Sequence, residues 1–120
     1  MSQNATYSMI ITQLLNDQRD AEGMSLSDFL TASGLSQSTW SRISRGISHF
    51  SIEELRATCN ALSLDLSEII KTADRLARDL PETEGVNVLD NLKGTENKSI
   101  LPTIIAGAAL AFLISRALKK

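Results

Sequence analysis

The polar side chains between Ser36 and Arg45 have the chemistry of a surface that contacts a nucleic acid. This stretch of sequence carries amide, hydroxyl and guanidinium groups and contains no carboxylate. Its polar residues that we expect on the outside are Gln37, Ser38, Ser41, Arg42 and Arg45. Groups of these kinds hydrogen-bond the edges of bases and the oxygens of phosphates. The pattern therefore favours binding to a nucleic acid.

A short helix between two turns would present these side chains. Gly34 can adopt the left-handed conformation that ends the preceding helix. The hydroxyl of Ser36 can cap the first turn of the next one. Trp40 and Ile43 lie three residues apart, so they would face inward together. The sequence thus predicts a turn, a short helix with one polar side, and a stop at Gly46.

The flanking sequence predicts four further helices. An apolar stripe that includes Leu14 and Leu15 marks the first, from Ala5 to about Arg19. Capping-box pairs predict where three others begin; these pairs are Ser25 with Asp28, Ser51 with Glu54, and Asp65 with Glu68. The second helix should cover Leu26–Ser33. The fifth carries an apolar stripe to Leu80, which would cover the domain or form a dimer seam, and Pro81 should end it.

The segment Met24–Ile70 resembles the helix-turn-helix domain of the phage-repressor and Cro-like (XRE-type) family. The matching residues are Gly23-Met24-Ser25, Phe29-Leu30, Gly34-Leu35-Ser36, Ser41-Arg42-Ile43, Arg45-Gly46, Ser51-Ile52-Glu53-Glu54-Leu55 and Ala61-Leu62. The resemblance implies a DNA-binding domain whose third helix enters the major groove. The sequence departs from the family at Phe50, where proline is usual, and at Leu26, where many relatives have a polar residue that contacts phosphate.

The resemblance also assigns roles to the polar side of the third helix. It implies that Gln37, Ser38 and Arg42 read bases, with Arg42 suited to guanine and Gln37 to adenine. It implies that a second set lies beside the DNA backbone, namely Ser36, Thr39, Ser41 and Arg45. Both sets are expectations carried over from the family.

Composition fits a small helical protein, yet the charge is unusual for one that binds DNA. The 120 residues carry a net charge of −2, and residues 1–80 hold seven Lys or Arg against ten Asp or Glu. A basic domain would have supported DNA binding directly. Here the positive charge must be concentrated at Arg42 and Arg45. A helix-turn-helix module that binds only protein is therefore the alternative.

No pattern in the sequence indicates catalysis or a metal. There is one cysteine, Cys59, which should be buried on the inward side of the fourth helix, and one histidine, His49, in a loop. We find no metal-ligand cluster, no nucleophile paired with a base and no phosphate-binding glycine loop. The sequence predicts a protein that is not an enzyme and has no cofactor. The lone thiol is typical of the reducing cytoplasm.

The C-terminal run is the second prominent feature. Ile100–Ser115 has no charge, and Ala117 and Leu118 continue the run past Arg116, which makes nineteen positions. A membrane-spanning helix needs about 20, and a helix that is apolar all round must be buried in lipid or protein. The run therefore predicts either an anchor in the inner membrane or a helix buried between subunits.

Taken together, the sequence predicts an all-α protein in three parts. Residues 1–80 form a five-helix DNA-binding domain, 81–99 a polar linker, and 100–120 a hydrophobic helix. The expected function is that of a cytoplasmic, sequence-specific transcriptional regulator, a repressor, that binds double-stranded DNA as a homodimer or higher oligomer. The alternative function is a membrane-attached interaction module that does not bind DNA.

Overall fold

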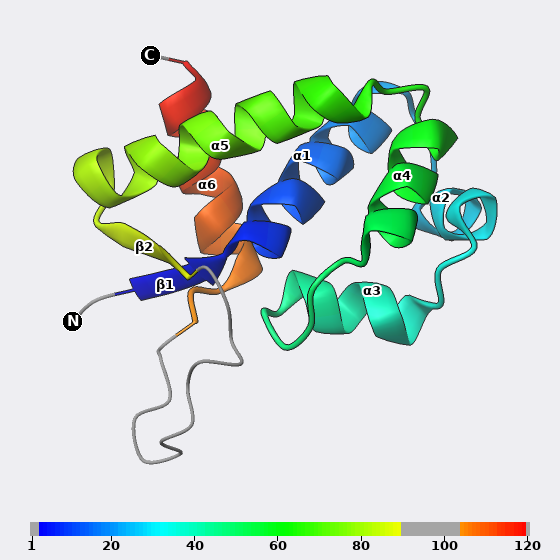
Figure 1. The fold of residues 1–120 in the computed structure, drawn as a ribbon, viewed down its shortest axis with the longest axis horizontal. Coiled ribbons are helices and arrows are strands. Elements are labelled where there is room, and N and C mark those ends of the chain that lie inside the picture. Colours follow the sequence, from blue (N-terminus) through cyan, green and yellow to red (C-terminus); the bar gives the residue numbers. More distant parts are fainter. Residues whose placement is uncertain (1–2, 90–103, 120) are drawn as a thin grey trace.

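The computed structural model describes residues 3–89 and 104–119 (Figure 1). Within these ranges the chain forms six helices and two short strands. Their order is β1 (Gln3–Thr6), α1 (Tyr7–Ala21), α2 (Leu26–Ser33), α3 (Gln37–Ser44), α4 (Ile52–Ala61), α5 (Leu66–Thr83), β2 (Val86–Leu89) and α6 (Gly107–Leu118). The prediction of an all-α protein is corrected, because the two strands make a small parallel sheet.

Helix α1 lies at the centre of the molecule, in contact with α3, α5 and α6 (Figure 1). Its first nine residues are almost all buried. The hydroxyl of Thr12, which is among them, donates to the carbonyl oxygen of Met9 at 2.7 Å, so burying it leaves no polar group unsatisfied. The stripe at Leu14 and Leu15 predicted one buried side. More sides are covered because α6 adds a partner that the stripe did not anticipate.

Caps that are local in sequence set where the helices begin. Each of α1 to α5 starts after a residue whose side-chain oxygen accepts a backbone N–H of the first turn. These residues are Thr6, Ser25, Ser36, Ser51 and Asp65. Helix α2 has the limits that the sequence predicted.

The end of α5 differs from the prediction, because the helix continues through Pro81 to Thr83. The N–H of Glu84 still donates to the carbonyl oxygen of Leu80 at 3.0 Å, so the last turn closes around the proline. Strand β2 follows and pairs with β1 in parallel, from Gln3 with Val86 to Thr6 with Leu89. Within the linker predicted for 81–99, residues 81–83 therefore belong to α5 and 86–89 to β2, and residues 90–99 lie outside the described part.

The C-terminal segment packs on the rest of the chain. Ile104 forms a parallel bridge with Asn4, and the N–H of Ile105 donates to the carbonyl oxygen of Asn4 at 2.8 Å. Helix α6 then packs against α1 and α5, with Leu110 and Ile114 fully buried. The apolar stripe at the end of α5 and the apolar tail were the two surfaces that the sequence left without a partner. They cover each other.

No helix in the described ranges is long and apolar enough to cross a membrane. Helix α6 has 12 residues and begins at Gly107, so the prediction of a spanning helix over Ile100–Leu118 is corrected; residues 100–103 lie outside the described part. A membrane-spanning helix would be apolar and buried on every side. One side of α6 is exposed instead, including Phe112 at 62 %. It consists partly of alanine and serine, which cost little to leave in water.

Candidate nucleic-acid interface

A tight turn sets the start of α3. Gly34 has φ +73°, the left-handed conformation that the sequence predicted for it. The N–H of Leu35 donates to the carbonyl oxygen of Leu30 at 3.2 Å, which closes the end of α2. The hydroxyl of Ser36, two residues after Gly34, accepts a hydrogen bond from the N–H of Thr39 at 3.0 Å. Together the turn and the cap fix the angle at which α3 leaves α2.

The inward side of α3 is anchored by Trp40 and Ile43, which are 5 % and 0 % exposed. The indole meets the ring of Phe29 edge-on, with centroids 5.2 Å apart, and the ring of Phe50 at 6.2 Å. Phe50 stands where the resembled family has proline, and its ring covers the indole. Its backbone N–H also donates to the hydroxyl of Ser8 at 3.1 Å, which joins the loop after α3 to α1.

The three residues predicted to read bases are all exposed. Gln37 and Ser38 lie in the first turn of α3, and Arg42 follows one turn after Ser38 on the same side. Among the described residues, none makes a hydrogen bond or ion pair with the guanidinium of Arg42. It is therefore free to bind a partner outside the chain.

The residues predicted to lie beside the DNA backbone divide into two pairs. Ser36 donates its hydroxyl proton to Oγ1 of Thr39 at 2.9 Å, which leaves the hydroxyl proton of Thr39 for another acceptor, such as a phosphate oxygen. Arg45 is exposed, and its Nε donates to the carbonyl oxygen of Ser41 at 3.4 Å. The terminal nitrogens of Arg45 can still bind an anion, whereas Ser41 is only half exposed.

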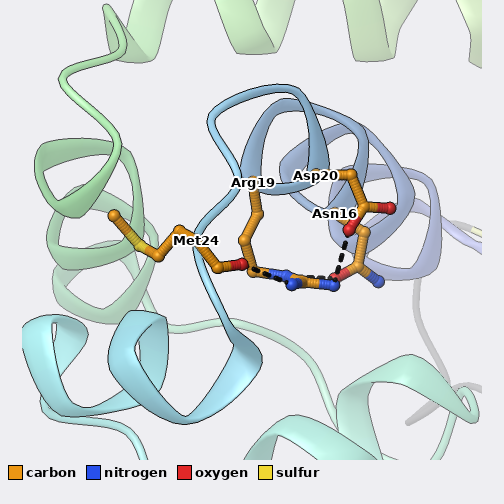
Figure 2. Close-up of polar contacts among 4 residues, drawn as sticks. All are labelled: Asn16, Arg19, Asp20 and Met24. Atoms are coloured by element: carbon orange, nitrogen blue, oxygen red, sulfur yellow. Dashed lines mark hydrogen bonds and ion pairs between the residues drawn. The ribbon is translucent and has the colours of Figure 1, made fainter.

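The sequence indicated Arg19 only as the end of a helix. In the structure its side chain links the end of α1 to the segment before α2. Its Nη1 donates to the carbonyl oxygen of Met24 at 2.7 Å, and Nε donates to Oδ1 of Asn16 at 3.4 Å (Figure 2). Nη2 lies 3.2 Å from Oδ1 of Asp20. The side chain is 17 % exposed, so this arginine fixes α1 to the start of α2 and adds little to a DNA-binding surface.

A groove of about 370 Å³ lies between α2 and α3 and is lined by Leu26, Ser27, Leu30, Thr31, Leu35 and Gln37. Leu26 is the residue that stands where many relatives of the resembled family have a phosphate-contacting polar group. Here it forms part of an apolar wall. The first turn of α2 therefore offers backbone N–H groups rather than this side chain to any phosphate nearby.

Cys59 and His49 lie as the sequence predicted. Cys59 is 1 % exposed, and burial, with a smaller contribution from the carboxylate of Asp65, raises the pKa of its thiol. His49 is exposed in the loop after α3. Among the described residues, no three His, Cys, Asp or Glu side chains are grouped so that they could hold a metal ion.

Comparison with known protein families identifies the arrangement. Residues 11–69 match a helix-turn-helix domain family, over a span that runs from α1 into α5 and includes the turn at Gly34. No curated protein and no solved structure matches the chain. Residues 11–69 are thus similar to a helix-turn-helix domain, a domain whose usual role is in DNA binding and transcription regulation.

Proposed function

We propose that this protein is a sequence-specific DNA-binding transcriptional regulator of the Cro-like kind, acting as a repressor that occupies promoter DNA. The observation that carries the proposal is the exposed polar side of α3. Gln37, Ser38 and Arg42 face outward, while Trp40 and Ile43 hold the opposite side in the core. A helix with a rigid apolar anchor and an outer side of amides, hydroxyls and guanidinium groups suits the major groove.

In this proposal Arg42 donates to guanine and Gln37 pairs with adenine, with Ser38 between them. Thr39, Ser36, Ser41 and Arg45 bind the phosphate backbone and set the register of the helix. Arg42 suits its role because no described side chain competes for its guanidinium. Such contacts to base edges give sequence preference, whereas contacts to phosphates give affinity for any sequence.

One domain of this kind covers a half-site, so the proposal includes two copies on a two-fold operator. The end of α5 and the tail, which the sequence offered as dimer seams, are buried against each other within one chain. A dimer on DNA would therefore use other surfaces, such as the side of α6 that bears Phe112.

A protein-interaction module that does not bind DNA is the second candidate. The acidic balance of residues 1–80, seven Lys or Arg against ten Asp or Glu, favours it because DNA would repel most of that surface. The local absence of carboxylates between Ser36 and Arg45 favours DNA, since the helix that enters the groove carries only positive charge.

The test is selection of sequences from a random pool of double-stranded DNA with the full chain. We expect enrichment of a two-fold symmetric motif, whose affinity exceeds that of scrambled duplex by at least about a thousandfold. A pool that stays random, with weak and equal affinity for all duplexes, would reject the DNA-binding proposal and favour the interaction module.

A further inference from the structure

The C-terminal end of α3 lies against the tail of the chain. Gly46 follows α3 with φ +81° and is buried. A methyl group built there would lie 2.9 Å from Sδ of Met9 and 3.0 Å from Cγ2 of Ile104. The two side chains thus pack directly over the glycine and leave no room for a Cβ. Ile104, from the C-terminal segment, therefore forms part of the surface on which α3, the helix proposed to read DNA, packs.

Ile104 is itself held firmly. It bridges to Asn4 of β1, and the next residue, Ile105, donates its N–H to the carbonyl oxygen of Asn4 at 2.8 Å and is 4 % exposed. The carbonyl oxygen of Gly107, three residues after Ile104, accepts a hydrogen bond from Nε2 of Gln13 at 3.3 Å. These bonds tie the segment to β1 and α1, so Ile104 presents a fixed surface to Gly46.

The middle and the C-terminal end of α3 consequently pack on different parts of the chain. Trp40, in the middle of the helix, packs on Phe29 of α2. The last turn of α3 carries Arg42, and Arg45 follows it directly. The chain then reaches Gly46, on which Met9 and Ile104 pack. The carbonyl oxygen of Arg42 accepts the N–H of Ile47 at 2.8 Å, and that of Ile43 accepts the N–H of Gly46 at 3.1 Å, so this turn moves with the glycine.

We propose that Ile104 is a positioning residue for sequence recognition: by packing on Gly46, it sets the orientation of the C-terminal turn of α3 and hence the reach of Arg42 into the groove. The inference rests on the proposed DNA-binding function. It assigns to the C-terminal segment, which lies outside the helix-turn-helix match, a part in the choice of DNA sequence rather than in the fold alone.

Three substitutions separate this contact from general packing. Ile104→Val keeps a methyl at the Cγ2 position nearest Gly46. Ile104→Leu keeps the volume and removes that methyl, and Ile104→Ala removes both branches. Ile114→Ala is the matched control, because Ile114 is fully buried in α6 and contributes none of the three atoms nearest to a Cβ built at Gly46.

The measured quantity is the ratio of affinities for the enriched motif and for a scrambled duplex, at a temperature where every variant is folded. Ile104→Ala and Ile104→Leu should lower this ratio by roughly 2- to 30-fold, the usual range for residues that act through another. Ile104→Val and Ile114→Ala should leave the affinity ratio near the wild-type value. Ile114→Ala should do so even though it lowers the melting temperature more than the Ile104 substitutions do. Equal ratios for Ile104→Leu and Ile104→Val would overturn the proposal.

Hydrogen exchange at the amides of Gly46 and Ile47 gives a second readout that needs no DNA. Ile104→Leu should speed exchange at these two amides relative to wild type, whereas Ile114→Ala should not change them relative to the rest of α3. If the wild-type chain binds no DNA, the proposed function fails and the role of Ile104 in sequence recognition fails with it, whereas this exchange measurement still decides whether Ile104 holds the C-terminal turn of α3. Unchanged protection in Ile104→Leu would then overturn it.

Discussion

The indole of Trp40 meets the ring of Phe29 edge-on, with centroids 5.2 Å apart and planes at 77°. This contact joins α3 to α2 from the inward side, while the outward side of α3 stays exposed. Edge-to-face pairs add about 0.5–1.5 kcal/mol to the burial of the rings themselves. Trp40 is therefore one of the main side chains that hold α3 on the domain.

We expect Trp40→Ala to lower the free energy of unfolding by about 3–5 kcal/mol, because it removes the largest anchor of α3 and leaves a cavity. Urea unfolding followed by circular dichroism measures the change. Gln37→Ala is the control, since Gln37 is exposed in the same helix. A loss below about 1 kcal/mol for Trp40→Ala would show that α3 is held in another way.

Removing a buried side chain from α6 should destabilise the whole protein, whereas removing an exposed one should have little effect. Ile114 is fully buried where α6 lies against α1 and α5, so Ile114→Ala should cost about 2–5 kcal/mol. Phe112 is 62 % exposed, so Phe112→Ala should stay within about 0.5 kcal/mol. Thermal unfolding of both variants checks this. Equal stabilities would mean that α6 does not pack on the domain.

Truncation after residue 103 extends the same argument. It removes α6, which packs against α1 and α5 in the intact chain, and should therefore uncover apolar side chains on both helices. We expect the shortened chain to be less stable and to bind the apolar dye ANS, which the intact chain should not. A shortened chain with unchanged stability and no dye binding would contradict the observed packing.

Cys59 should react slowly with thiol reagents while the protein is folded. Burial raises the pKa of its thiol and blocks access, and the thiolate is the reactive form. The native chain should be alkylated at least about a hundredfold more slowly than the chain in urea, because reaction requires local opening. Similar rates in both conditions would place the thiol on the surface.

The helix-turn-helix part could be predicted because its signals are local. Gly34 and Ser36 mark a helix end and a helix start within three residues, and the spacing of Trp40 and Ile43 defines the buried side of α3. These features depend on neighbours in sequence, so they survive without knowledge of the tertiary structure. The roles of Gln37, Ser38 and Arg42 on DNA stay predictions.

The tail could not be predicted in the same way. Its apolar composition shows that it must be covered, but covering by lipid, by a second chain or by α5 looks the same in sequence. The stripe through Leu76 and Leu80 was visible, yet the packing of α6 on α5 joins elements far apart in the chain. The strand Gln3–Thr6 has no alternation of apolar and polar residues, and only its pairing with Val86–Leu89 makes it a strand.

Arg45 should contribute to affinity without contributing to sequence preference. Its guanidinium is exposed near the end of α3, where the proposal has it bind phosphate. Arg45→Ala should weaken binding to motif and scrambled duplexes alike and lower the slope of log affinity against log salt by about one unit. A loss confined to the motif would instead assign Arg45 to base contact.

The central claim, that the outer side of α3 reads base sequence, is tested most directly by Arg42→Ala. Titration of this variant and the wild type with the enriched motif, and with the motif changed at each position, measures both affinity and preference. Arg78→Ala removes the same charge from α5, a helix that lies across the molecule from α3 (Figure 1), and serves as the control. We predict that Arg42→Ala costs about 1–3 kcal/mol on the motif and removes the preference at one position, while Arg78→Ala does neither. Equal losses on motif and scrambled DNA for Arg42→Ala would contradict the account.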